Sequence, residues 1–338
     1  MTVYRMDIHP RAPLHQGIHG RAPKSGALVH SDTLHAALIA AAAATGAHVD
    51  DLERMRELPM SSLYPTLHGK PLYPKPFLRP PGADNNRERP EDDQDHKRWK
   101  KLRLVSEAML RAWLTGDVDT FDACELRDGV AALTGEFPEW PGSGLLADAR
   151  HTGVVVDRNG ADATPYDRPM VWVNAKEGVG LYCLVEAGDG DGPWLEEAFT
   201  RLGWAGLGGE RASGLGGFDV ARCAPDAVPK FANGAANRFM TLGLYLPRKD
   251  EVDAGVLDAP AAYDCVLRGG WIHGVAGAEK AKHALRFCLE GGVFNGSADN
   301  PGDVRDVRPD GWPHPVWRSG RPLVIPFQCT TQPGGLTS

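Results

Sequence analysis

A glycine-rich stretch joins a helical pattern to a strand pattern near the middle of the chain. The sequence GWAGLGGERASGLGGF, residues 203–218, has seven glycines in sixteen residues. It follows an amphipathic helical pattern in which apolar residues recur at i, i+3, i+4 and i+7, namely Leu195, Ala198, Phe199 and Leu202. It continues directly into FDVARC, which has the pattern of a strand. A loop in this place joins the second helix of a βαββαβ unit to its fourth strand.

The order of the other patterns agrees with that unit. TVYRMDI alternates as a strand, SDTLHAALIAAAAATG is a helical pattern with Ser31 as its expected N-cap, and VVVDRNG and PMVWVNAKEGVGLYCLVEAG supply strands. We therefore predict an α+β fold with a ferredoxin-like domain over residues 1–226. The proline- and aromatic-rich residues 61–105 are expected to form an inserted, thumb-like β-hairpin. Residues 227–338 show several strand patterns and one weak helical pattern at 251–257, which indicates a second, degraded ferredoxin-like domain.

Composition restricts the class of protein. The chain has 338 residues, 42% hydrophobic and 24% charged, which is typical of two folded domains. Its longest apolar run, residues 36–44, is too short for a membrane span, so we expect no membrane association. The six cysteines lie more than twenty residues apart, and the histidines have no zinc-site spacing, which favours a cytoplasmic protein with reduced thiols and no metal or cofactor.

Three hypotheses explain the glycine-rich loop. A nucleotide site would need a GxxxxGK[ST] or GxGxxG motif that opens a helix, and this loop, although superficially similar to that of small-molecule kinases, enters a strand. A track for single-stranded RNA would use the glycines for close backbone approach, Arg211 for phosphate and Ser213 for phosphate or the 2′-OH. The third hypothesis is a loop that only packs across a sheet, with Glu210 and Arg211 as a solvated pair. The net charge of -7 requires any RNA track to be local.

A family resemblance extends this reasoning. GLGGERASGLGGFDV resembles the glycine-rich loop of RAMP proteins, the RNA-binding subunits of CRISPR effector complexes. Further segments are similar, in order and spacing, to the fourth Csm subunit of type III-A CRISPR complexes, over nearly the whole chain. These segments are APLHQG, HSDTLHAALIAAA, LYPKP, KRWKKLRLVS, VVVDRNG, GLYCLVEAG, LRGGWIHG, LEGGVFNG and HPVWRSGRPLVIPF.

The resemblance implies a protein without catalytic activity that holds the 5′ tag of the crRNA. It also implies two protein partners, the large polymerase-like Csm subunit and the first backbone RAMP subunit. The thumb-like hairpin would press on the RNA where tag meets guide. The residues expected to contact RNA are His15, Lys24, His30, Ser31, Lys75, Lys100, Lys101, Gly208, Gly209, Arg211, Ser213 and Gly214.

There are two alternative functions. Related RAMP subunits cut precursor crRNA with a histidine as general acid or base, so a metal-independent endoribonuclease is the main alternative function. The glycine-loop kinase is the second. Tryptophans on helix or strand faces, among them Trp113 and Trp172, are expected to be core residues, and the lysines of the hairpin could instead form a solvated face.

Overall fold

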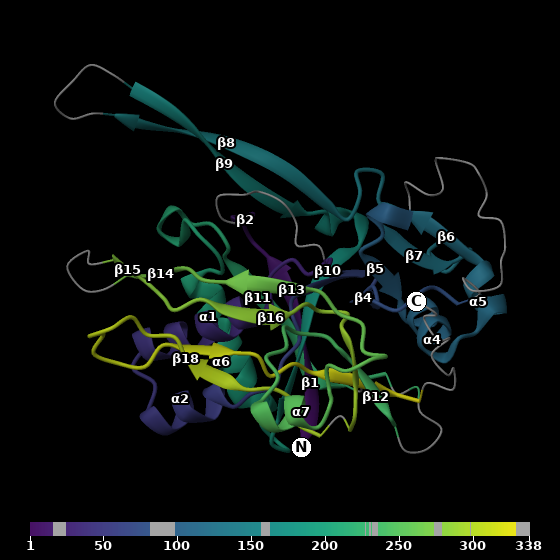
Figure 1. Cartoon of the computed structure of the whole chain (residues 1–338). Coiled ribbons are helices and arrows are strands. Elements are labelled where there is room, and N and C mark those ends of the chain that lie inside the picture. The colour runs from purple at the N-terminus through teal and green to yellow at the C-terminus, as the bar shows by residue number, and fades with distance from the viewer. Residues whose placement is uncertain are drawn as a thin grey trace.

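The computed structural model describes residues 1–15, 25–81, 99–156, 163–226, 228–229, 231, 236–273, 279–297 and 299–328. Within these residues it has an eight-stranded sheet, several smaller sheets and helices against one face of the large sheet (Figure 1). The predicted α+β fold is confirmed.

Four strands and two helices build one end of the molecule around the large sheet. They are β1 (Thr2–Pro10), α1 (Ser31–Ala44), β3 (Tyr64–Leu67), β10 (Val179–Ala187), α6 (Gly192–Ala205) and β11 (Phe218–Asp226). The strands lie in the order β11-β1-β10-β3, and each is antiparallel to its neighbour. Helix α6 forms where the sequence predicts it, and the four apolar residues of its pattern are all buried.

Helix α1 also forms as predicted, but its predicted cap is wrong. The N-cap is His30, and the hydroxyl of Ser31 makes no capping hydrogen bond. It accepts instead from the backbone N–H of Leu244, at 2.9 Å. Local preference would use the Ser31 hydroxyl for a cap hydrogen bond at the start of the helix. In the structure it contacts a residue 213 positions away in the sequence instead.

The inserted residues extend the other end of the sheet. The strand order continues β3-β4-β5-β7-β6, and only β5 and β7 are parallel. The elements are α2 (Val49–Arg56), β4 (Lys70–Pro74), β5 (Leu104–Ser106), α4 (Glu107–Thr115), α5 (Val118–Asp122), β6 (Cys124–Arg127) and β7 (Val130–Leu133). The described parts of 61–105, residues 61–81 and 99–105, thus belong to the sheet, and the predicted hairpin's middle, 82–98, lies outside the described residues.

A long hairpin projects from the body elsewhere (Figure 1). Its strands are β8 (Leu146–Val156) and β9 (Ala163–Val173), paired from Leu146↔Val173 to Val156↔Ala163. The short β2 (Leu14–His15) adds a third strand at its base. The sequence indicates these strands, but our prediction put the projecting hairpin in residues 61–105.

The C-terminal half consists of short strands and one short helix. A three-stranded sheet has the order β17-β12-β20, and three two-stranded ribbons surround it. The elements are β12 (Arg238–Thr241), α7 (Lys249–Asp253), β13 (Cys265–Arg268), β14 (Trp271–His273), β15 (Glu279–Ala281), β16 (Leu285–Cys288), β17 (Val293–Asn295), β18 (Val304–Asp306), β19 (Trp317–Ser319) and β20 (Val324–Phe327). The predicted boundary at 226/227 stays a prediction.

Both faces of the large sheet are covered. Along β10, Leu181, Cys183 and Val185 join the buried cluster formed with α1 and α6. The alternate residues Tyr182 and Leu184 join a second cluster, which includes Met240, Leu242, Ile325 and Phe327 of the C-terminal sheet. Since neighbouring residues of a strand point to opposite faces, α1 and α6 cover one face and the C-terminal half covers the other.

Candidate functional site

The glycine-rich loop folds back on itself and lies beside β2. The backbone N–H of Leu207 donates to the carbonyl of Gly216, at 2.9 Å. The N–H of Gly216 donates to the carbonyl of Pro13, at 3.0 Å, and that of Gly209 to the carbonyl of His15, at 3.4 Å. The loop joins α6 to β11, as predicted, and is fixed against residues 13–15.

Two glycines in this loop are required by geometry. Gly216 has φ of +72°, and a Cβ there would lie 1.9 Å from the carbonyl oxygen of Leu207. Gly208 has φ of +94°, and its Cβ would lie 2.8 Å from the carbonyl oxygen of His15. Because both neighbours are backbone atoms, no side-chain movement can make room.

The polar side chains of the loop point to solvent. Arg211, Ser213 and Gly214 are exposed, and residues 211–213 form one 3-10 turn. Glu210 does not form the pair with Arg211 that the hypothesis of a merely packing loop expects: its Oε2 lies 3.4 Å from Nη1 of Arg168 on β9 and accepts from Ser213 Oγ, also at 3.4 Å. Among the residues the structure describes, no acidic side chain pairs with Arg211. Its guanidinium is therefore available to an anion.

His15 connects the loop, β2 and the base of the hairpin. Its Nδ1 donates to the carbonyl of Pro169, at 2.8 Å, because a carbonyl can only accept. In the neutral ring Nε2 is then an acceptor, which suits a hydroxyl donor such as a ribose 2′-OH. A Cβ on Gly209 would lie 2.6 Å from Cδ2 of His15, so the glycine lets the loop lie against the ring.

The other predicted RNA contacts lie elsewhere. Lys75 follows β4 and is half-buried, and burial followed by the Arg103 charge lowers its pKa. Lys100 and Lys101 are exposed just before β5, where Lys101 lines a cavity of about 670 Å³ with Arg127 and Trp140. Since β11 and β5 are separated by four strands in the sheet order, these lysines do not share a surface with Arg211. Lys24 lies outside the described residues.

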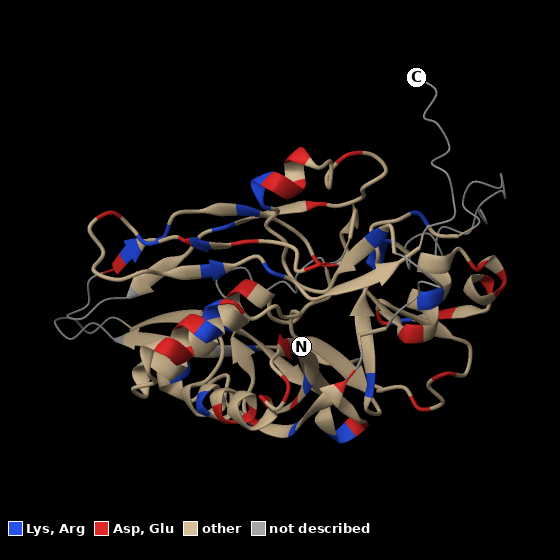
Figure 2. Cartoon of the chain, turned by 90° about the horizontal axis from the view of Figure 1, so that it is seen from below, with Lys and Arg blue, Asp and Glu red and all other residues tan. Residues whose placement is uncertain are grey.

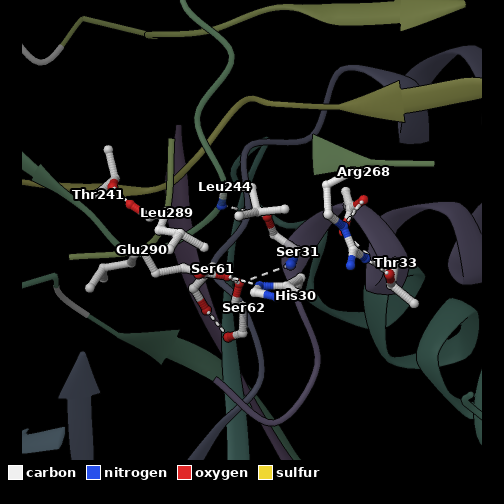
Figure 3. Close-up of polar contacts among 12 residues, drawn as sticks. His30, Ser31, Thr33, Ser61, Ser62, Thr241, Leu244, Arg268, Leu289 and Glu290 are labelled. Carbon is white, nitrogen blue, oxygen red and sulfur yellow. Dashed lines mark hydrogen bonds and ion pairs between the residues drawn. The ribbon is translucent and has the colours of Figure 1, made fainter. Parts of the chain in front are cut away.

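His30 and Ser31 lie in a buried polar network (Figure 3). Nδ1 of His30 donates to Oε1 of Glu290, at 2.6 Å, and Ser62 Oγ donates to the same oxygen, at 2.5 Å. The backbone N–H of Ser31 donates to Ser62 Oγ, at 2.8 Å. Glu290 is 0% exposed and Ser31 3%. Nδ1 of His30 and the backbone N–H and hydroxyl of Ser31 are engaged inside the protein, where they join α1 to the C-terminal half, so we leave both residues out of the candidate RNA surface.

An ion cluster lies next to this network. Asp32, 1% exposed, accepts two hydrogen bonds of 3.0 Å from Arg268 and lies 3.5 Å from Nη1 of Arg318. Burial alone would raise the pKa of Asp32, but the charge and hydrogen bonds of Arg268, followed by the Arg318 charge, hold it below its ordinary value. Burial would also raise the pKa of Glu290, but the charge and hydrogen bond of His30 outweigh it. The pKa of Glu290 therefore lies below its ordinary value.

The pH dependence of stability follows from these directions. Burial would lower the pKa of His30, but Glu290 raises it above the ordinary 6.5. The stabilisation from His30 is then complete below about pH 6.5 and is lost as pH rises through the raised pKa. We expect the free energy of unfolding, measured with urea at several pH values, to decrease as the pH rises above about 6.5. The His30→Asn variant should not show this decrease. His48→Asn, at an exposed histidine, is the control, and an equal slope in all three proteins would contradict the assignment.

Two general searches of the described part of the chain gave negative results. No three His, Cys, Asp or Glu side chains lie together in a way that could hold a metal ion. Nor does any helix there have both the length and the apolar character needed to cross a bilayer. The charges in the view of Figure 2 are mixed, with Lys and Arg interspersed among Asp and Glu rather than gathered in one basic track.

Comparisons with known proteins agree with this architecture. Residues 234–327 match the family profile of the CRISPR Csm4 C-terminal domain. The CRISPR system Cms protein Csm4 of Mycobacterium tuberculosis (strain CDC 1551 / Oshkosh) is 28% identical over 323 residues, which cover 92% of this chain and 93% of that protein.

Solved structures share the fold at lower identity. A chain in the crystal structure of a Csm3-Csm4 subcomplex of the type III-A CRISPR-Cas interference complex matches with a TM-score of 0.64 at 19% identity. The match covers 97% of this chain and 100% of the other. The crystal structure of a Csm1-Csm4 cassette in complex with cA4 matches with a TM-score of 0.60 at 15% identity, covering 98% and 100%.

An α+β chain with a glycine-rich loop fixed beside its N-terminal strands, and with these relatives, is similar to subunits of CRISPR effector complexes. Within that class the C-terminal domain match and the nearly full-length similarity point to one subunit. Residues 234–327 match the Csm4 C-terminal domain, and the chain as a whole is similar to Csm4 proteins.

Proposed function

We propose that the chain is a non-catalytic, crRNA-binding subunit of a cytoplasmic type III-A interference complex, and that it holds the 5′ tag of the crRNA. The observation that carries this proposal is the glycine-rich loop, fixed beside His15, with an exposed Arg211 that has no ion-pair partner among the described residues. A sugar-phosphate backbone can approach the exposed Gly214, where a Cβ would have nothing within 4 Å, and the guanidinium can bind one phosphate in fork geometry. The strand order β11-β1-β10-β3 supports a ferredoxin-like RAMP domain around this loop, with a degraded second copy in the C-terminal half.

The protein partners are proposed from the relatives. One similar structure is a Csm3-Csm4 subcomplex and the other a Csm1-Csm4 cassette. By this likeness the chain would bridge the large polymerase-like subunit, Csm1, and the backbone subunit, Csm3.

The thumb is proposed to be the β8–β9 hairpin. It projects from the body, and its base is joined to β2, which lies directly beside the glycine-rich loop (Figure 1). Val154 and Val155, in its outer part, are 55% and 60% exposed. Exposed valines far from the core favour contact with another molecule. This hairpin therefore fits the role better than residues 61–105.

Of the two alternatives, the kinase has less support in the geometry. The glycine-rich loop leads into β11 and not into a helix, so it lacks the helix N-terminus that a kinase of that type uses for phosphate. A ribonuclease would need a histidine with a ring nitrogen open to proton exchange; Pro169 holds Nδ1 of His15 and leaves Nε2 for that role, so a cleavage assay decides this alternative.

One experiment tests the proposed function. The tagged chain, expressed in a cell that contains its whole complex, should copurify with crRNA whose 5′ ends carry the repeat-derived tag, as sequencing of the bound RNA would show. Recovery of the complex without crRNA would contradict the proposal. Defined cleavage of repeat RNA by the purified chain in the absence of metal would instead favour the endoribonuclease.

Arg211→Ala is expected to weaken binding of a tag-bearing RNA by about 1–3 kcal/mol, the scale of one charge-assisted contact, and to leave the unfolding free energy unchanged. Binding is measured by fluorescence anisotropy at moderate salt. Lys249→Ala, at an 87% exposed side chain on α7, is the matched control. Equal affinities for both variants would remove Arg211 from the RNA surface.

A further inference from the structure

An exposed tryptophan lies on the same sheet face as the candidate site. Trp172 on β9 is 47% exposed, contrary to its predicted place in the core. Its neighbour Val171 points to the other face and belongs to the core cluster of α1 and α6. The residue directly opposite Trp172, on β8, is Ala147. With such a small neighbour, the indole is not covered from that side.

The same face leads from Trp172 to the glycine-rich loop. Residues two apart on a strand share a face, so Trp172 follows Met170 and Arg168 along β9. His15 is the register partner of Met170, and its ring lies against Gly209. Arg168 pairs with Glu210 of the loop. Met170, between Trp172 and Arg168, is only 8% exposed, so the indole and Arg168 lie at the two ends of one face of β9, with the His15 ring opposite its middle.

The chemistry of this surface fits a single-stranded RNA better than a protein. A protein interface would need a contiguous exposed apolar core, but the apolar neighbours of the indole on this face are the small Ala147 and the 8% exposed Met170, and beyond them lie arginine, histidine and a polar loop. An open aromatic ring, an arginine without an ion-pair partner among the described residues and exposed glycine backbone are the groups that bind unpaired bases and their phosphates.

We infer that Trp172 is a stacking platform for one base of the RNA whose backbone lies along the glycine-rich loop. This inference rests on the proposed function. The added contact would not distinguish one base from another, because every base has a face on which an indole can stack. The base and Arg211 would hold the strand at two points on either side of His15.

The test uses the full-length chain and a tag-bearing RNA. Trp172→Ala is expected to lower affinity by about tenfold, and Trp172→Phe to retain most of it, because phenylalanine keeps a ring for stacking. Replacing tag bases one at a time with an abasic nucleotide should weaken binding to the wild type at one position and have no effect there in Trp172→Ala. Trp271→Ala, at a 61% exposed tryptophan on β14, is the matched control.

The outcomes separate this inference from the proposed function. Unchanged affinity of Trp172→Ala, together with weakened binding by Arg211→Ala, would overturn the stacking platform alone. Loss of a copurifying protein subunit from Trp172→Ala without loss of RNA would overturn it in favour of a protein contact. Absence of RNA binding by the wild type in its complex would overturn both. Since the side chain is half exposed, urea unfolding of Trp172→Ala should match the wild type, and Trp172→Phe provides a second variant if it does not.

Discussion

Asp32→Asn is expected to lower the free energy of unfolding by about 3–5 kcal/mol, the largest effect of any substitution proposed for this chain. Asp32 is 1% exposed and forms two 3.0 Å hydrogen bonds with Arg268. An asparagine has no charge to offset Arg268 and the nearby Arg318, whose side chain is 10% exposed. Two guanidinium groups would then remain partly desolvated and without their counter-ion. The measurement is urea unfolding followed by circular dichroism.

A double-mutant cycle shows whether the loss comes from this contact. Arg268→Met alone and Asp32→Asn alone should each be strongly destabilising, and the double variant should be less so than their sum. Asp50→Asn, at a 91% exposed aspartate, is the control and should change little. Additive effects would mean that the destabilisation arises from general damage at the start of α1.

Gly216→Ala should have the largest effect on RNA binding, a loss of at least about tenfold in affinity. Its Cβ would lie 1.9 Å from the Leu207 carbonyl oxygen, and its φ of +72° is itself unfavourable for alanine by about 1–2 kcal/mol. The loop must therefore open and give up its hydrogen bonds to Pro13 and Leu207. Anisotropy with a tag-bearing RNA measures the loss.

Two other glycines give graded controls for that result. Gly214 has φ of +80° but open space around its Cβ, so Gly214→Ala should show only the conformational penalty. Gly209→Val would meet the His15 ring at 2.6 Å, a side chain that can move, and should fall between the two. Wild-type affinity in Gly216→Ala would show that the loop conformation has no part in binding.

The sequence predicts local structure well in this chain, and contacts across it poorly. The helix 192–205 is amphipathic by itself, so its buried face is visible in the sequence. The cap of α1 is not, because Ser31 contacts Leu244 from the other half of the chain. Trp172 was expected in the core because PMVWV is apolar at alternate positions on both faces, so the pattern cannot tell which face is covered.

The residues of the candidate site that are adjacent in the sequence could be predicted, and those brought together by strand pairing could not. Arg211, Ser213 and the glycines lie in one continuous stretch, and their position between a helix and a strand is confirmed. The lysines at 75, 100 and 101 were grouped with them by charge alone, and the strand order separates them. Arg168 was missed because only the pairing of β9 with β2 brings it to the loop.

The burial of both faces of the large sheet has a consequence for how nucleic acid can be bound. An RNA-recognition motif stacks bases on the open face of its four-stranded sheet. Here β12 and β20 occupy that face at β10 and β3, and Tyr64 and Tyr182, which point to it, are 0% and 1% exposed. The aromatic residues on that face pack against the C-terminal half, so they are not open for stacking with bases. In the proposed function, RNA would therefore bind at the rim of the sheet and not on its face, and a substitution there would change RNA affinity without disturbing the core.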